Sequence, residues 1–169
     1  MTVQVGDKLP DLSLSYVPFD PKEDLQACPR PIPFKLHEEL KGKKAVIFAI
    51  PGAFTPTCSE QHVPEFLAKY DELKKHGIDK VICVSGNDGF VMNAFAKVSG
   101  SNGKVLMVSA SDSGFFEALD LTIGEPKLGS LLRPKRFALL VDDLVVKYVG
   151  VENGPGIEAS GPASILSRL

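Results

Sequence analysis

The sequence predicts an α/β fold, a three-layer sandwich in which helices cover both faces of a central mixed β-sheet. Short and almost wholly apolar runs, typical of buried strands, alternate with segments in which apolar residues recur at helical spacing. The last two strand-like runs flank Asp142-Asp143, which predicts a hairpin within the sheet. A chain of 169 residues can bury a substantial core, so residues 1–169 are predicted to form one domain.

The chain before residue 58 is predicted to contain a long loop and a buried strand. Residues 17–35 include five prolines, which exclude a helix interior or a central strand. This segment, which carries Cys28, is therefore predicted to be a surface loop. Residues 44–50 form a nearly continuous apolar run and are predicted as a central strand, followed by a turn-rich connection over 51–57.

A helix is predicted over residues 58–76 because apolar side chains recur there at helical spacing. These side chains are Val63, Phe66, Leu67, Tyr70 and Leu73. Pro64 lies inside the segment and is predicted to kink the helix, and Gly77 suits its C-terminal cap.

The next part of the chain repeats the alternation of strand and helix. Residues 80–85 are predicted as a second buried strand, and Asp88 is predicted to cap the helix that follows. The apolar face of that helix is predicted to comprise Phe90, Val91, Ala94, Phe95 and Val98. Residues 104–109 are predicted as a third strand, and 113–119 as a short helix.

The chain is predicted to end with a β-hairpin and a helix. Residues 137–141 and 144–149 are the two strands of the hairpin, and 160–169 form a closing amphipathic helix. This order of elements fits a thioredoxin-like arrangement.

Composition excludes several classes of function. Lys and Arg number 19 and Asp and Glu 21, so the formal net charge of −2 gives no bulk attraction to nucleic acid or to an anionic membrane. No apolar run approaches the ~20 residues that a membrane span needs. Three widely spaced cysteines argue against a disulfide scaffold and for a reducing compartment.

The two ends of the chain bear on location. The first residues carry no basic and apolar stretch of the signal-peptide kind, so a cytoplasmic protein is expected. The last three residues, Ser167-Arg168-Leu169, resemble the peroxisomal address S-K-L, which makes the peroxisome the alternative.

The connection over 51–57 delivers Cys58 to the first turn of a helix, where unpaired N–H groups and the helix dipole favour a thiolate. An ordinary thiol has a pKa of about 8.5, and lowering such a value to about 6 takes about 3 kcal/mol. A helix terminus typically supplies about 0.3–1 kcal/mol, so a full positive charge nearby is also required. Thr55 lies on the same turn and can supply a hydroxyl, either to a substrate or as a helix cap.

The cysteine and histidine pattern weighs against three other chemistries. A dithiol oxidoreductase needs C-x-x-C, and the third residue after Cys58 is Gln61. A cysteine hydrolase needs a histidine with an orienting partner, and of His37, His62 and His76 only His62 is placed near the cysteine. Cys58 and His62 alone are too few ligands for a structural zinc ion.

The string P-G-A-F-T-P-T-C over 51–58 resembles the P-x-x-x-T-x-x-C motif of the peroxiredoxins. The form G-A-F-T-P-T-C, followed by His62-Val63-Pro64, is similar to that of the type II, or fifth, subfamily. The likeness continues at 84–91, 135–143 and 165–169, and therefore covers nearly the whole chain.

The resemblance implies a thiol peroxidase that reduces hydrogen peroxide and alkyl hydroperoxides without a metal or an organic cofactor. Cys58 matches the peroxidatic cysteine, which attacks the peroxide and becomes a sulfenic acid. Thr55 matches the residue that orients the peroxide, and Pro51 matches the one that shields the sulfur from water. In type II members the histidine at the place of His62 supports the active-site hydrogen bonds.

The resemblance also implies where the required cation comes from. Arg136 matches the family's active-site arginine, which lies just before the strand over 137–141. Arg133 and Lys135 are near competitors, and the neighbouring sequence favours Arg136.

The sulfenic acid must be resolved by a second thiol. The stretch over 156–161, where many type II members have a resolving cysteine, contains none. Cys83, in the middle of a predicted strand, is expected to be a buried small hydrophobe. Some members of the subfamily have a resolving cysteine in the proline-rich loop that carries Cys28. The resemblance thus makes Cys28 the resolving candidate, acting on Cys58 of the partner in a homodimer.

Other routes for reducing the sulfenic acid stay open. In the alternative to resolution by Cys28, Cys58 is the only reacting cysteine and is reduced by glutathione and glutaredoxin rather than through thioredoxin. The resemblance implies a homodimer formed through loops near the active site, with Phe54 and the turn over 88–90 as contacts. A hypothesis from another class is a redox-sensing or chaperone-like scaffold, for which an intact Thr55, Cys58 and Arg136 set would be unnecessary.

Overall fold

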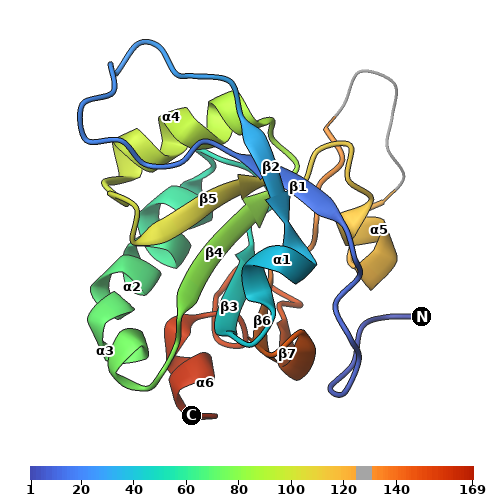
Figure 1. Ribbon diagram of the computed structural model, residues 1–169. Coiled ribbons are helices and arrows are strands. Elements are labelled where there is room, and N and C mark those ends of the chain that lie inside the picture. The colour runs from blue at the N-terminus through green and yellow to red at the C-terminus, as the bar shows by residue number, and fades with distance from the viewer. Residues whose placement is uncertain (125–130) are drawn as a thin grey trace.

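The computed structural model describes residues 1–124 and 131–169, and within these residues seven strands form one mixed sheet (Figure 1). The strands are β1 Ser13–Tyr16, β2 Ile32–Lys35, β3 Lys44–Ala49, β4 Lys80–Ser85, β5 Val105–Ser109, β6 Phe137–Asp142 and β7 Val145–Val151. Their order across the sheet is β2-β1-β5-β4-β3-β6-β7. Neighbours β3, β4 and β5 are parallel, and the other neighbouring pairs are antiparallel. The prediction of an α/β fold with a mixed sheet is confirmed.

Helices cover both faces of the sheet (Figure 1). They are α1 Leu36–Leu40, the π-helical turn η1 Cys58–His62, α2 Val63–Ala68, α3 Tyr70–Lys75, α4 Gly89–Ser99, α5 Phe115–Leu119 and α6 Pro162–Leu166. The alternation of side chains along β3 gives the sheet its two cores. Ala45, Ile47 and Ala49 pack with α1 and α5, whereas Val46 and Phe48 pack with η1, α2, α3, α4 and α6. Cys58 belongs to the second of these cores.

Part of the segment predicted as a loop over 17–35 is ordered in the sheet. Its last residues form β2, which pairs with β1 at one edge of the sheet, and α1 follows directly. Pro33 stands opposite Ser15 in this pair. A proline is tolerated here because an edge strand has one side without a ladder partner. The prolines exclude a central strand, as predicted, but they do not exclude the edge strand β2.

The segment predicted as one helix over 58–76 is divided in three. It begins with η1, continues as α2, and breaks at Lys69, where ψ is 4°. The predicted kink at Pro64 is wrong, since this proline lies in the first turn of α2, where an N–H has no intrahelical partner. Gly77 has φ +88° just after α3, as its predicted capping place requires.

Two further predictions about helices need correction. Asp88 caps α4 through a hydrogen bond from the Val91 N–H to its carboxylate, 2.9 Å, but the buried side of α4 is not the predicted one. That side comprises Gly89, Met92, Asn93 and Phe95, whereas Phe90 and Val98 are exposed. The closing helix is only Pro162–Leu166, shorter than the predicted 160–169.

Among the described residues, no helix combines the length and the apolar character needed to cross a bilayer.

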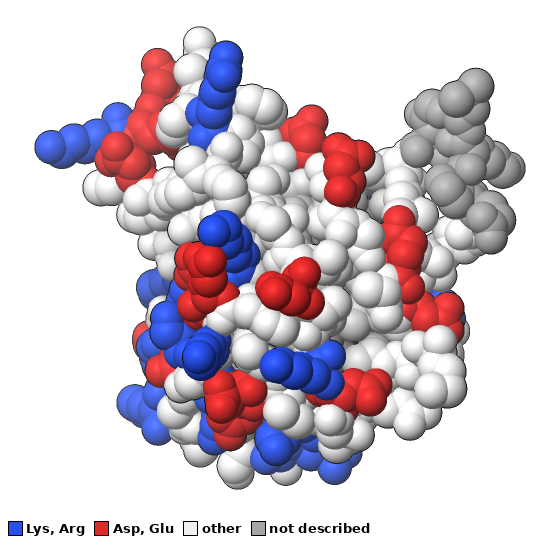
Figure 2. All heavy atoms as spheres, turned by 45° about the vertical axis from the view of Figure 1, so that its right-hand side comes forward, with Lys and Arg blue, Asp and Glu red and all other residues white. Residues whose placement is uncertain are grey.

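The charged side chains of the surface are mixed in sign. Figure 2 shows one face of the molecule, on which basic and acidic side chains intermingle over the lower part. This face therefore reflects the nearly balanced composition of the chain.

Candidate active site

The turn between β3 and η1 is held in place by its neighbours in the sheet. The Ala53 N–H donates to Oδ1 of Asn87, 2.8 Å, in the loop after the parallel strand β4. Arg133 Nη1 donates to the carbonyl of Pro51, 2.8 Å. Phe54 has φ +64°, an uncommon conformation for a side chain of this size. These contacts fix the path of the chain into η1, which begins at Cys58.

The sulfur of Cys58 lies in a fully buried side chain and receives two hydrogen bonds. Thr55 Oγ1 is 2.8 Å from Sγ, and Arg136 Nη2 is 3.1 Å from it. The Thr55 hydroxyl also lies 2.8 Å from the carbonyl of Gly52, so its one proton has two acceptors. A sulfur that faces both a hydroxyl and a guanidinium is suited to carry negative charge.

His62 extends this arrangement away from the sulfur. Its Nδ1 lies 2.9 Å from Arg136 Nη1, and its Nε2 lies 2.9 Å from the carbonyl of Ser160. Arginine only donates and a carbonyl only accepts, so the ring is neutral with its proton on Nε2. The pKa of His62 is lowered from 6.5 to about 4, mainly by burial, while the hydrogen bond to Ser160 raises it and the positive charge of Arg136 lowers it.

The three candidate cations have different positions. Arg136 stands directly before β6, and β6 is paired with β3, the strand that leads to Cys58. Its guanidinium is the one that bonds to the sulfur. Arg133 bonds to Pro51 instead, and Lys135 is an exposed residue beside the same turn. The geometry thus joins Arg136, Thr55 and His62 to Cys58, with Pro51 on the adjoining turn.

Comparisons with known proteins identify the family of this chain. The family model described as Redoxin matches residues 4–165. Peroxiredoxin-2D of Arabidopsis thaliana is 41% identical over 167 residues, which cover 99% of this chain and 98% of that protein. The chain belongs to the peroxiredoxins.

Two solved structures and one further relative add detail. Reduced Prx3 of Vibrio vulnificus in complex with H2O2 has 34% identity and a TM-score of 0.85, with 98% of this chain and 95% of that chain covered. A Burkholderia cenocepacia protein provisionally described as a thioredoxin reductase has 39% identity and a TM-score of 0.88, with 100% and 99% covered. A Lipomyces kononenkoae protein provisionally named a peroxisomal peroxiredoxin is 40% identical, with 96% and 99% covered.

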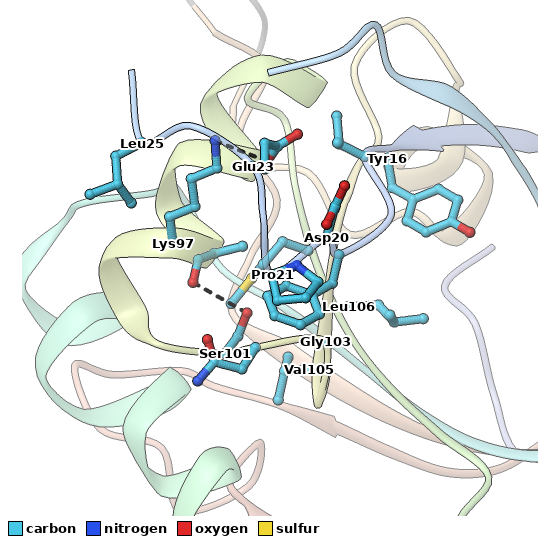
Figure 3. A pocket seen from close by; sticks show the side chains of 15 residues that line it. Tyr16, Asp20, Pro21, Glu23, Leu25, Lys97, Ser101, Gly103, Val105 and Leu106 are labelled. Carbon is cyan, nitrogen blue, oxygen red and sulfur yellow. Dashed lines mark hydrogen bonds and ion pairs between the residues drawn. The ribbon is translucent and has the colours of Figure 1, made fainter. Parts of the chain in front are cut away.

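A hollow of about 480 Å³ lies beside the active site of this peroxiredoxin. Pro51, Thr57 and Arg136 line it together with Glu152. It therefore brings solvent to the residues that surround the buried sulfur. A hollow of about 520 Å³ lies elsewhere, between the loop after β1 and α4 with β5, and none of the predicted site residues lines it (Figure 3).

Cys28 lies in the loop that passes over α4 (Figure 1), and it is half-buried and unpaired. Lys97 of α4 holds this loop. Its Nζ lies 2.6 Å from the carbonyl of Asp24 and 2.8 Å from that of Ala27, and it forms a 2.9 Å ion pair with Glu23 (Figure 3). Cys28 is not among the residues that line the hollow beside Cys58.

Cys83 lies in the middle of β4, fully buried. Burial raises the pKa of the Cys83 thiol well above its usual value, the charge of Cys58 raises it further, and Arg136 acts in the opposite direction. A thiol in this environment stays protonated and unreactive. Its position is that of the buried small hydrophobe expected from the sequence.

Three residues that support the site carry no signal in the sequence. Asn87 holds the turn before Cys58, and Ser160 with Glu152 holds His62 from a segment about a hundred residues further along the chain. Asn87 follows β4, the parallel neighbour of β3, and so lies where adjacent strand ends meet. No spacing links His62 to Ser160, whose contribution is a backbone carbonyl.

Proposed function

We propose that this peroxiredoxin reduces hydrogen peroxide and alkyl hydroperoxides through a thiolate at Cys58. The observation that carries the proposal is the pair of hydrogen bonds to Cys58 Sγ, 2.8 Å from Thr55 Oγ1 and 3.1 Å from Arg136 Nη2. A cation and a hydroxyl at these distances stabilise a thiolate and leave donors beside the atom that the peroxide must reach.

In the proposed reaction the sulfur attacks the terminal peroxide oxygen. An S–O bond forms, the O–O bond breaks, and the leaving oxygen takes a proton to give water or an alcohol, while Cys58 becomes a sulfenic acid. Thr55 orients the peroxide, and the guanidinium of Arg136 stabilises the charge that develops on the separating oxygens. Pro51 limits the access of water to the sulfur. His62 supports Arg136 from the side away from the sulfur.

We propose that Cys28 of the partner subunit resolves the sulfenic acid in a homodimer. The half-buried place of Cys28 in a loop suits this role better than the fully buried Cys83. Phe54 and Phe90 are about half exposed, at 51% each, and are the proposed dimer contacts. After mild treatment with peroxide, the wild type should form a covalent dimer on non-reducing electrophoresis, and Cys28→Ser should not. A covalent dimer that persists in Cys28→Ser would refute this step.

The one-cysteine route remains the alternative for recycling. In that route glutathione and glutaredoxin reduce Cys58 directly, whereas resolution by Cys28 gives a disulfide suited to thioredoxin. In both routes sulfur carries the redox change, so we propose no metal and no organic cofactor. Steady-state peroxide consumption with each donor, for wild type and Cys28→Ser, distinguishes the two routes.

The direct test of the proposed function is a coupled peroxide-consumption assay on wild type and Cys58→Ser. We expect turnover in the wild type and none in Cys58→Ser, with correct folding of both checked by circular dichroism. A redox-sensing or chaperone-like scaffold would give no turnover in either protein.

For localisation we propose the cytoplasm, with import into peroxisomes as the alternative. The alternative is supported by Ser167-Arg168-Leu169, whose three residues are exposed, and by the name of the Lipomyces relative. The guanidinium of Arg168 lies over the ring of Tyr148, 5.0 Å from its centroid, so a receptor would first have to lift this side chain. Imaging of the chain fused at its N-terminus to a fluorescent protein, with and without the last three residues, tests the address.

A further inference from the structure

Glu152 follows β7 and has no part in the proposed reaction, yet it is held next to the active site. Its backbone N–H donates to the carbonyl of Arg136, 2.9 Å, so it is fixed beside the start of β6. Its side chain reaches the segment before α6. Oε1 accepts hydrogen bonds from the Ala159 N–H, 2.7 Å, the Ser160 N–H, 2.7 Å, and the Ser160 hydroxyl, 2.8 Å. One carboxylate oxygen thus holds residues 159 and 160 in a single arrangement.

The residue held in this way is the one that orients His62. Ser160 is fully buried, and its carbonyl accepts the proton of His62 Nε2 at 2.9 Å. That bond leaves the lone pair of Nδ1 free to accept from Arg136 Nη1, 2.9 Å, and the other nitrogen of the same guanidinium reaches Cys58 Sγ. An unbroken series of hydrogen bonds therefore joins Glu152 to the sulfur through Ser160, His62 and Arg136.

We propose that Glu152 is a positioning residue of the peroxidase reaction, which acts through Ser160 and His62 to hold the Arg136 guanidinium against the sulfur of Cys58. The expected effect of Glu152 on the rate with peroxide rests on the proposed function. Its expected effect on the ionisation of Cys58 does not. Other roles are less suited to this geometry, because the structure records no ion pair of Glu152 with Arg136 among the described residues. The carboxylate acts on the backbone of the segment, not on the guanidinium directly.

A positioning role and a simple charge effect shift the ionisation of Cys58 in opposite directions. Removal of a negative charge near Cys58 would by itself stabilise the thiolate and move the midpoint of its alkylation to lower pH. Loss of the positioning series would weaken the contact of Arg136 with the sulfur and move that midpoint to higher pH. The titratable and charged groups around the sulfur are Arg136 from the start of β6, His62 from η1 and Cys83 from β4.

The experiment uses the reduced full-length protein and the variants Glu152→Ala and Glu152→Gln. It measures the second-order rate constant with hydrogen peroxide and, by mass spectrometry of the Cys58 peptide, the pH midpoint of iodoacetamide alkylation. In Glu152→Ala we expect the peroxide rate to fall about tenfold to a hundredfold and the midpoint to rise. Glu152→Gln keeps an acceptor oxygen at the same reach but loses the charge, so the peroxide rate should stay close to that of the wild type and the midpoint should not rise.

Two further variants keep the test decisive. Glu158→Ala removes a carboxylate from the same segment that does not bond to residues 159 and 160, and it should leave both quantities unchanged. If Glu152→Ala does not fold, Glu152→Asp shortens the reach by one methylene and should move both quantities in the same direction. An alkylation midpoint that stays or falls in folded Glu152→Ala or Glu152→Asp, with an unchanged peroxide rate, would overturn the proposal. A wild type without peroxidase turnover would instead refute the proposed function, and the alkylation comparison would still test the positioning role.

Discussion

Acidification should destabilise this protein through His62, and the structure gives both the direction and the size of the effect. The ring is fully buried, and its pKa is lowered from 6.5 to about 4, mainly by burial. Above pH 6.5 the ring is neutral in the folded and the unfolded chain, so its contribution to stability is complete. Between pH 6.5 and about 4 the unfolded chain binds a proton that the folded protein does not, and the free energy of unfolding falls.

The size of this loss follows from the two pKa values. Each pH unit between them is worth about 1.4 kcal/mol, so His62 should contribute a loss of about 3 kcal/mol between pH 7 and pH 4. This is a large part of the roughly 5–15 kcal/mol that usually stabilises a folded domain. Carboxylates also titrate in this range, so His62 has to be isolated by comparison with a variant that lacks its ionisation.

The assay is urea unfolding, followed by circular dichroism, of the wild type and His62→Gln at several pH values from 4 to 7.5. Both proteins are kept reduced. We expect the difference between their free energies of unfolding to change by about 3 kcal/mol over this range, with the wild type losing more. A difference independent of pH would show that His62 is not held neutral by burial, and the tautomer assigned to it would then be wrong. If His62→Gln does not fold, the NMR titration of the His62 ring in the wild type gives the same answer.

Three further outcomes are expected. Thr55→Val should slow the reaction with peroxide about a hundredfold in stopped-flow measurements, whereas Thr55→Ser keeps the hydroxyl 2.8 Å from Cys58 Sγ and should retain most of the rate. Cys83→Ser places a hydroxyl in a fully buried site and should cost about 1–3 kcal/mol in urea unfolding, while Cys83→Ala remains an active peroxidase. Gly150→Ala places a Cβ against the backbone oxygen of Ala159 and should cost about 1–3 kcal/mol of stability; an unchanged Tm would contradict that packing.

The central part of the fold can be predicted because its signals are local. The strands β3, β4 and β5 are continuous apolar runs bounded by turns, and each is predicted to within one residue of its observed ends. The edge strand β2 and its neighbour β1 give no such signal, since both are short and partly exposed and β2 contains Pro33. They form because β1 pairs with β5, a partner far away in the sequence.

The apolar face of α4 cannot be predicted because several of its sides carry apolar residues. Phe90 and Val98 lie on the exposed side, while Asn93 lies on the buried side. Asn93 is accommodated there by a 3.1 Å hydrogen bond to the carboxylate of Glu23, from the loop that crosses the helix. Packing of that loop on α4 is not predicted, so nothing in the helix itself identifies the buried side.

Site residues that lie close together in the sequence can be predicted, and those that only the fold brings together are harder to predict. Thr55 and Cys58 lie in one turn, and their spacing and the position of the helix start place them together. The roles of Arg136 and His62 come from the resemblance of the surrounding sequence, since pairing of β3 with β6 brings Arg136 to the sulfur from far along the chain. Ser160 acts through its backbone carbonyl and Glu152 through a carboxylate that binds backbone N–H groups, and contacts to the backbone leave no pattern of residue types to detect.

The most direct test of the proposed mechanism is the second-order rate constant of reduced protein with hydrogen peroxide, wild type against Arg136→Gln, with iodoacetamide alkylation of Cys58 measured in parallel. We expect both rates to fall, because the guanidinium 3.1 Å from the sulfur favours the thiolate. The peroxide rate should fall further than the alkylation rate, since only that reaction also uses the guanidinium to stabilise the breaking O–O bond. A peroxide rate in folded Arg136→Gln equal to that of the wild type would contradict the mechanism.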